Sequence, residues 1–203
     1  LERRHGRIAT LLDVACGTGA ITAPLSRAYQ VSGLDIAPGM LAVARGKLPG
    51  DVPLYLADMT SFTLSTRFDA IVCAYQGVNH LLSLPAWQSF FGCAFRHLNP
   101  GGMLVFDIAT VRYLMTMASI PKVVEQFGDN YLQITVSTTD GARFRWHIEV
   151  FELQRDGRYV LLTQAVEMRS FPVDQVKEAL CHRFTDIEVI GGDGRSADWE
   201  SDG

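Results

Sequence analysis

The chain has 203 residues, of which 48% are hydrophobic, so it can bury the core of one α/β domain together with a small subdomain. Its net charge is -4 and it contains no long run of Lys or Arg, so we expect no nucleic-acid partner, since such a surface needs a basic stripe. No apolar run reaches membrane-spanning length and no signal peptide opens the chain, so we also expect no membrane partner and a cytoplasmic location.

The first half of the chain alternates predicted strands with predicted helices. Strands are expected near residues 9–15, 31–36, 52–57, 69–75 and 102–108, and helices near residues 20–29, 39–47 and 85–97. Pro24, Pro38 and Pro85 lie at or near the helix starts, where a missing N–H is tolerated. This alternation predicts an α/β fold with a doubly wound, mostly parallel, Rossmann-like sheet, whose ligands bind at the carboxyl ends of the strands.

The second half is rich in β-forming residues and Asp-Gly turns. Runs at residues 131–138, 143–153 and 159–171 predict a three-stranded antiparallel meander, because Asp-Gly between such runs favours hairpins. In the middle run Phe144 and Trp146 tend to one face, while Arg145, His147 and Glu149 tend to the other. An amphipathic helix at 173–183, a strand at 184–190 and a loop at 191–203 complete the prediction.

The most informative segment is residues 11–19, Leu-Leu-Asp-Val-Ala-Cys-Gly-Thr-Gly. It is an apolar strand that ends in Asp13 and runs into a turn with Gly17 and Gly19, and Asp35 ends the next strand. Glycines in such a turn let the backbone approach a ligand, and an acid at the end of the next strand suits a ribose hydroxyl pair. The sequence therefore predicts a nucleoside-bearing cofactor.

Two residues distinguish between the nucleoside cofactors. The dinucleotide fingerprint Gly-x-Gly-x-x-Gly has Thr22 in place of its third glycine, and the Asp13 carboxylate would repel a pyrophosphate. The same carboxylate suits S-adenosylmethionine, which carries an ammonium group, a positive sulfur and a ribose but no phosphate. An NAD-type oxidoreductase is one alternative, and a non-catalytic nucleoside-binding or partner subunit with the same fold is the other.

The segment around Asp13 resembles motif I of class I S-adenosylmethionine-dependent methyltransferases. Later segments resemble the ribose-binding strand end (33–41), the adenine-binding strand end (56–59), the fourth strand (68–75) and the turn into the fifth (98–107). The resemblance implies a set of cofactor-binding residues: Asp13, Ala15, Gly17, Gly19, Asp35, Ile36, Met40, Asp58, Met59 and Ala74. Asp69 and Asp107 are expected to be structural, or to support other site residues, rather than to contact the ligand.

The expected adenine contacts follow from the same resemblance. The Asp58 carboxylate would accept from the adenine amino group, and the Met59 backbone amide would donate to a ring nitrogen. The alternative is that Asp58 only caps a helix, as acids at strand ends often do. Cys16 lies in the cofactor turn and is interpreted as a small residue rather than a nucleophile. The four cysteines do not have the spacing of metal ligands, so no metal is expected.

Residues 75–82 follow the fourth strand and supply the candidate catalytic groups. His80 is the candidate general base, with a surface or capping histidine as the alternative. Tyr75 could line the sulfonium or acceptor pocket through a cation–π contact, or it could be ordinary wall packing. The motif Asn/Asp-Pro-Pro-Tyr/Phe of methyltransferases that act on nucleobase or glutamine nitrogens is absent here.

The position of the meander, after the fifth strand, resembles a branch of small-molecule methyltransferases that includes sugar N,N-dimethyltransferases. In that branch the insert covers the acceptor site. The resemblance implies a cofactor-binding core at 1–110, an acceptor lid at 111–172, and a last helix, strand and tail at 173–203. It implies methylation of a small molecule and favours N-methylation over O-methylation. The alternative is that the meander is a dimerisation surface or plain cover, and a homodimer is left open.

Overall fold

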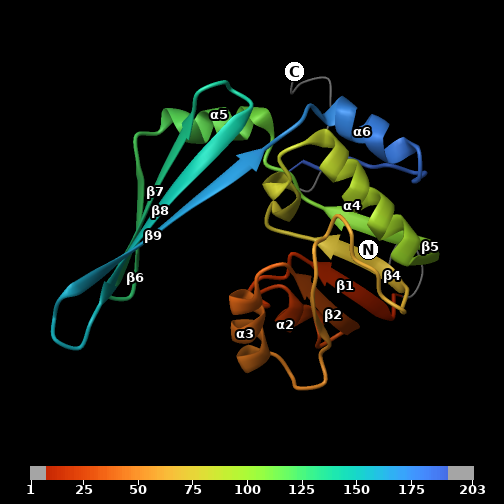
Figure 1. Ribbon diagram of the computed structural model, residues 1–203, viewed down its shortest axis with the longest axis horizontal. Helices are drawn as coiled ribbons and strands as arrows, with labels where there is room; N and C mark the ends of the chain where they lie inside the picture. The colour runs from red at the N-terminus through yellow and green to blue at the C-terminus, as the bar shows by residue number, and fades with distance from the viewer. Residues whose placement is uncertain (1–7, 192–203) are drawn as a thin grey trace. The chain divides into compact units, whose positions relative to one another are not determined.

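The computed structural model describes residues 8–191, and the chain divides into two compact units (Figure 1). The first unit runs to Val78 and also includes Leu84–Ile108 and Glu178–Ile187. The second includes Asn79–Ser83, Ala109–Lys177 and the described residues from Glu188 onward. The loop predicted at 191–203 lies, after Gly191, outside the described residues. No helix among residues 8–191 is long and apolar enough to span a membrane.

The first unit is built on a five-stranded parallel sheet with the order β3-β2-β1-β4-β5. Its strands are β1 Thr10–Val14, β2 Gln30–Asp35, β3 Leu54–Leu56, β4 Phe68–Cys73 and β5 Leu98–Phe106. The order changes direction between β1 and β4, which is where open parallel sheets bind ligands at the carboxyl ends of their strands. This confirms the doubly wound sheet that the sequence predicts.

The helices of this unit follow the strands in the predicted order. They are α2 Thr22–Leu25, α3 Pro38–Lys47 and α4 Leu84–His97, and the 3₁₀-helix η1 Gly77–His80 begins in this unit and ends in the second. The helix predicted at 20–29 is wrong in length, because regular α-helix ends at Leu25. The Ser26 hydroxyl donates to the carbonyl of Ala23, and such local side-chain bonds compete with helix continuation.

The core of the first unit lies around β1 and α4. Leu11, Leu12 and Val14 on β1 are fully buried, as expected for a central parallel strand that is covered on both faces. Phe90 and Phe91 on α4 are equally buried. These apolar contacts fix the strands whose carboxyl ends carry the site.

Asp69 ties together the opposite, amino-terminal edge of the sheet. Its Oδ2 accepts from the backbone amides of Ala9 and Thr10, both at 2.9 Å, and its Oδ1 accepts from the Asn99 side chain at 2.8 Å. These hydrogen bonds lower the pKa of Asp69 to about 2. Asp69 is therefore structural, as expected.

The second unit contains a four-stranded antiparallel sheet with the order β6-β7-β8-β9. Its strands are β6 Val123–Phe127, β7 Asn130–Thr138, β8 Arg143–Leu153 and β9 Tyr159–Arg169, and its helix α5 spans Val111–Ser119. The three predicted strands are confirmed as β7, β8 and β9, which run side by side in Figure 1. The prediction of only three strands is wrong, because β6 pairs with β7. Strand β6 is short and mostly exposed, so it lacks the alternating pattern that identifies a half-buried strand.

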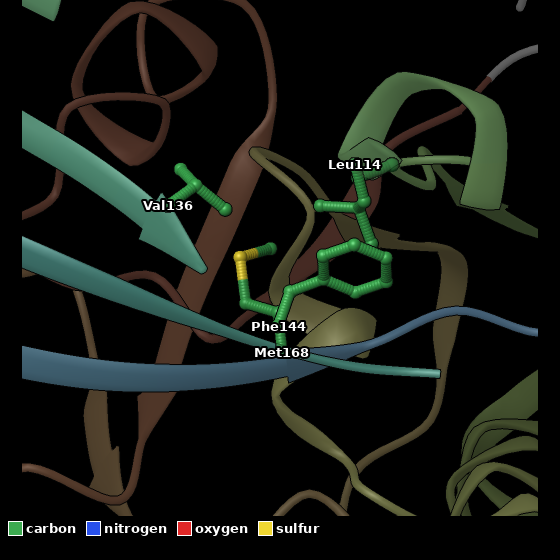
Figure 2. Close-up of a cluster of buried hydrophobic side chains, with 5 residues drawn as sticks. Leu114, Val136, Phe144 and Met168 are labelled. Carbon is green, nitrogen blue, oxygen red and sulfur yellow. The ribbon is translucent and has the colours of Figure 1, made fainter. Parts of the chain in front are cut away.

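A small apolar core lies between α5 and one face of this sheet. Figure 2 shows Leu114 of α5 together with Val136, Phe144 and Met168 from three strands, and all four are buried. The face of β8 that carries Phe144 is the predicted apolar face. Arg145 on the opposite face is exposed and pairs with Glu167 at 2.9 Å, which confirms the predicted alternation.

Residues after the second sheet differ from the prediction. Helix α6 Val173–Cys181 is confirmed but ends two residues before Arg183. The strand predicted at 184–190 is wrong, since this segment is irregular apart from one bridge residue. The backbone amide of Phe184 donates to the carbonyl of Leu180, and Asp186 has φ +54, which interrupts extended structure.

Candidate functional site

The loop after β1 has the backbone shape of a ligand-binding turn. Ala15, Gly17 and Gly19 all have positive φ values, of 57, 55 and 78 degrees. A Cβ on Gly17 would meet no atom within 4 Å, whereas a Cβ on Gly19 would lie 3.0 Å from Leu48 Cδ1. Gly17 therefore leaves space in which a ligand can approach the backbone. Gly19 instead allows the loop to pack closely against the Leu48 side chain.

Asp35 at the end of β2 is bound to this loop. Its Oδ2 accepts from the Gly17 amide and its Oδ1 accepts from the Ala37 amide, both at 2.8 Å, and the residue is 8% exposed. A carboxylate oxygen can accept more than one hydrogen bond, so both oxygens can also accept from the two hydroxyls of a ribose. The loop and the predicted ribose-binding acid thus form one unit.

Asp13 at the end of β1 is 1% exposed and accepts a 2.6 Å hydrogen bond from the Thr22 hydroxyl. Burial is the main reason that the pKa of Asp13 is raised to about 6; the Thr22 bond opposes this rise, and the nearby Asp35 charge adds to it. The role of Thr22 was not predicted from the sequence, although a hydroxyl in the first turn after a glycine loop was the available signal. A cationic ligand group would stabilise the ionised form of this carboxyl.

Cys16 fills the space under the loop. A Cβ on Gly33 would lie 2.9 Å from the Cys16 sulfur, so the glycine on β2 makes room for the thiol. Burial raises the pKa of Cys16 to about 12 and that of Cys73 to about 12. Neither thiol is ionised near neutral pH, which agrees with the interpretation of Cys16 as a packing residue.

The predicted adenine-binding residues follow β3. Asp58 is exposed, and its Oδ1 accepts from the amide and hydroxyl of Thr60, both at 2.7 Å. The acid therefore shapes a turn and caps no helix, because residues 58–67 contain only turn and irregular structure, while no hydrogen bond among the described residues uses Oδ2. Ile36 and Met40, which follow Asp35 in the chain, are 66% and 41% exposed, and exposed apolar side chains suit a ligand ring. The adenine assignment of Asp58 and Met59 stays a prediction.

His97 forms a hydrogen bond with the loop that follows Asp58. The Leu64 amide donates to its Nε2 at 2.9 Å, so Nδ1 carries the proton and donates to the Cys93 carbonyl at 2.8 Å. The Phe62 ring lies 4.4 Å from the imidazole, centroid to centroid. His97 is thus a structural residue that fixes the loop after Asp58.

A cavity of about 330 Å³ opens at the carboxyl ends of β4 and β5. It is lined by Ile21, Val72, Cys73, Ala74, Tyr75, Val105, Phe106 and Asp107. The predicted residues Ala74 and Tyr75 both lie in this wall, and Tyr75 is 75% exposed. Its lining is almost wholly apolar apart from Asp107 and the Tyr75 hydroxyl, so the cavity suits a small organic group.

The structure gathers most predicted site residues in the first unit, but not all of them. Gly17 lies in the loop after β1, Asp13 lies on the strand before this loop, and Asp35 accepts a hydrogen bond from the Gly17 amide. His80 ends η1, is exposed and belongs to the second unit, so its role as a base stays a prediction. Residues 8–191 contain no cluster of His, Cys, Asp and Glu side chains that could hold a metal ion.

These residues fit S-adenosylmethionine better than a dinucleotide. The open space at Gly17 admits a ligand to the backbone, and Asp35 can bind a ribose. The buried Asp13 carboxyl favours a cation nearby and disfavours a pyrophosphate. These residues therefore match a cationic nucleoside.

Comparisons with known proteins agree with this geometry. Residues 11–102 match the family described as methyltransferase domain. Over 195 residues the chain is 37% identical to a dTDP-3-amino-3,6-dideoxy-alpha-D-glucopyranose N,N-dimethyltransferase of Streptomyces fradiae, covering 95% of this chain and 76% of the relative.

Two solved structures are similar over nearly the whole chain. The sugar N-methyltransferase KedS8 from Streptoalloteichus sp ATCC 53650 has a TM-score of 0.81 at 26% identity, covering 97% of this chain and 79% of its own. The amino pentose methyltransferase CalS10 from Micromonospora echinaspora, solved with bound S-adenosylmethionine, has a TM-score of 0.78 at 27% identity, covering 93% and 81%. The chain therefore belongs to the class I S-adenosylmethionine-dependent methyltransferases, and S-adenosylmethionine is its cofactor.

Proposed function

We propose that this protein transfers a methyl group from S-adenosylmethionine to the amino group of a sugar that is carried on a nucleotide. The observation that carries the proposal is the 37% identity, across 95% of this chain, to an enzyme named for N,N-dimethylation of a dTDP-linked amino sugar. Two further relatives, from Streptomyces venezuelae and Saccharopolyspora spinosa, are named as N,N-dimethyltransferases of other amino sugars. All three relatives are named for an amine acceptor, which favours nitrogen over oxygen.

The cofactor supplies a methyl group on a positively charged sulfur, and the protein has to orient it. Asp35 would bind the ribose hydroxyls, and Asp13 would pair with the ammonium group. Asp58 and Met59 would bind the adenine. The cavity beside Ala74 and Tyr75 would hold the acceptor nitrogen on the far side of the methyl carbon. Holding two reactants in line in this way can lower a barrier by about 7–11 kcal/mol.

The lining of the cavity also suits an amine acceptor. An amine reacts only as the neutral form, and the product loses a proton after the new N–C bond has formed. The apolar lining residues Val72, Val105 and Phe106 disfavour the ammonium form, whereas the Asp107 carboxylate in the same lining can accept a hydrogen bond from the amine. No strong base has to act before transfer, in contrast to transfer to a hydroxyl.

The insert at residues 111–172 is proposed to carry the acceptor contacts. Its support is the polar face of β8, where Arg145 and His147 are exposed opposite the apolar face of Phe144 and Trp146. Replacing residues 131–171 by a short linker should leave cofactor binding within a few-fold and abolish methyl transfer. The cytoplasmic location and the homodimer also remain predictions.

The test is a matched pair of acceptors that differ in one atom. Initial rates are measured with a dTDP-linked sugar that carries an amino group and with the same sugar carrying a hydroxyl at that carbon. We expect methylation of the amine and none of the hydroxyl compound. Equal rates on the hydroxyl compound would contradict N-methylation, and turnover of neither would contradict the sugar-nucleotide acceptor.

A further inference from the structure

Two consecutive residues at the end of β4 have a strained backbone. Tyr75 has φ +55 and Gln76 has φ +61, and neither is a glycine. Residues of this kind persist in the left-handed region only where the surrounding structure holds them, and they gather at functional sites. Both belong to the turn that leads from β4 into η1, and Tyr75 lines the cavity.

The carboxylate of Asp107 holds this turn. The Gln76 amide donates to both of its oxygens, at 3.0 Å to Oδ1 and 3.1 Å to Oδ2. Asp107 directly follows β5, and β5 is the parallel neighbour of β4, with Cys73 paired to Phe106. The ends of two adjacent strands are thus joined by a charge-assisted hydrogen bond, which is stronger than a neutral one.

The next residue locks the turn against the cofactor loop. A Cβ on Gly77 would lie 2.8 Å from the Cys73 sulfur and 3.0 Å from the Cβ of Ala15. Ala15 is itself in the left-handed region, with φ +57. The turn therefore has little room to move between β4 and the loop after β1, which is expected to bind S-adenosylmethionine. A change in the shape of the turn would shift the cavity wall relative to that loop.

We propose that Asp107 is a positioning residue for methyl transfer. Through the Gln76 amide it keeps the Tyr75–Gln76 turn in its left-handed shape, and this sets where Tyr75 stands in the wall of the cavity. The inference rests on the proposed function in one respect, namely that this cavity takes the acceptor. Asp107 acts through the turn and not by touching the substrate.

Three variants separate this role from a direct one. Asp107→Ala removes the acceptor of the Gln76 hydrogen bond. Asp107→Asn removes the charge but keeps an oxygen that can accept from the same amide. The double variant Asp107→Ala with Gln76→Gly also lacks the carboxylate, but glycine takes φ +61 without strain, so the turn can keep its shape unaided.

The first readout needs no acceptor. Amide hydrogen exchange of Gln76, followed by NMR in the ligand-free protein, should be slow in the wild type and in Asp107→Asn, and at least about tenfold faster in Asp107→Ala if the carboxylate bond provides the protection. Equal exchange in wild type and Asp107→Ala would overturn the proposal. Thermal unfolding of each variant shows that the compared proteins are folded.

The second readout is transfer to the amine acceptor. We expect Asp107→Ala to lower kcat by about 10²-fold, since a small misplacement can cost that much, with the Kd for S-adenosylhomocysteine within a few-fold of wild type. Asp107→Asn and the double variant should each recover most of the rate. If both stay as slow as Asp107→Ala, the carboxylate acts on the substrate directly and the proposal is wrong. If the wild type methylates no amine, the proposed function has failed, while the exchange measurement still decides whether Asp107 holds the turn.

Discussion

The hydroxyl of Thr22 donates a 2.6 Å hydrogen bond to Oδ2 of Asp13, and both residues are buried. Thr22 occupies the position at which a dinucleotide-binding loop has its third glycine. Thr22 therefore does more than break the dinucleotide fingerprint, because its hydroxyl also donates a hydrogen bond to the carboxylate at the end of β1. Because Asp13 is buried, its protonation should affect how the affinity for the cofactor changes with pH.

Cofactor binding should weaken as the pH falls through about 6, the value to which burial raises the pKa of Asp13. The ammonium group of the ligand pairs with the ionised carboxylate, so at lower pH binding has to displace a proton. The Kd for S-adenosylhomocysteine, measured by calorimetry between pH 5 and pH 7.5, should rise toward the acid end (roughly the window set by this pKa). Asp13→Asn keeps an acceptor for Thr22 and should bind more weakly with a flatter pH profile. A wild-type profile as flat as that of the variant would remove Asp13 from the ammonium site.

The raised pKa of Asp13 also makes the stability of the ligand-free protein depend on pH. The pKa of Asp13 is raised from 3.8 to about 6 in the folded protein, so this group stabilises the ligand-free fold fully below pH 3.8 and loses that contribution as the pH rises through 6. The melting temperature of Asp13→Asn should therefore rise relative to wild type over this window. A constant difference between the two proteins would contradict a raised pKa.

Asp35→Ala should weaken binding of S-adenosylhomocysteine by about 1.5–3 kcal/mol, the range for a hydrogen bond to a charged group. Because Asp35 also accepts from the amides of Gly17 and Ala37, the melting temperature should fall as well. Asp51→Ala, at an exposed acid in the same unit, is the matched control and should change neither quantity. Unchanged affinity in Asp35→Ala would show that the ribose binds elsewhere.

Gly17→Val should abolish cofactor binding without unfolding the protein. The matched control is Gly101→Val, because Gly101 also has a positive φ, of 76 degrees, and a Cβ added to it would likewise meet no atom within 4 Å. Both variants carry the same kind of backbone strain, so their melting temperatures should fall alike, while only the first should lose calorimetric binding. Equal affinities in the two variants would mean that the ligand does not approach Gly17.

His80→Ala tests whether a general base is needed. A general base contributes about 10²–10⁴-fold in rate, so a loss of that size would indicate that a proton is removed during transfer, as an oxygen acceptor requires. The proposed amine acceptor predicts near-normal kcat at a pH above the pKa of that amine. Rates measured across pH separate the two outcomes.

The cofactor half could be predicted from the sequence because its signals are local. Apolar strands, the glycine turn and the acids at strand ends lie within short segments, and parallel strands bring their carboxyl ends to one edge. Strand β6 escaped prediction because it is short and mostly exposed. The strand expected at 184–190 failed because Asp186 takes a left-handed conformation, which the apolar pattern does not reveal.

Contacts between distant residues could not be predicted in the same way. The bond between Asp107 and the Gln76 amide joins residues 31 positions apart and depends on the register of β4 against β5. The Thr22 bond to Asp13 depends on where the first turn of α2 begins. The residue types at these positions are known from the sequence, but the backbone conformation that brings them together cannot be inferred from local patterns.

The fate of the methyl group itself decides whether the proposed activity is right. The protein is incubated with S-adenosylmethionine that carries a deuterated methyl group and with a dTDP-linked amino sugar, and the product is located by tandem mass spectrometry. We predict that the label is found on the sugar nitrogen, with S-adenosylhomocysteine formed in equal amount, and that Asp35→Ala lowers the yield at limiting donor. Label on a sugar oxygen, or no labelled product from a protein that binds S-adenosylhomocysteine, would contradict N-methylation of this acceptor class.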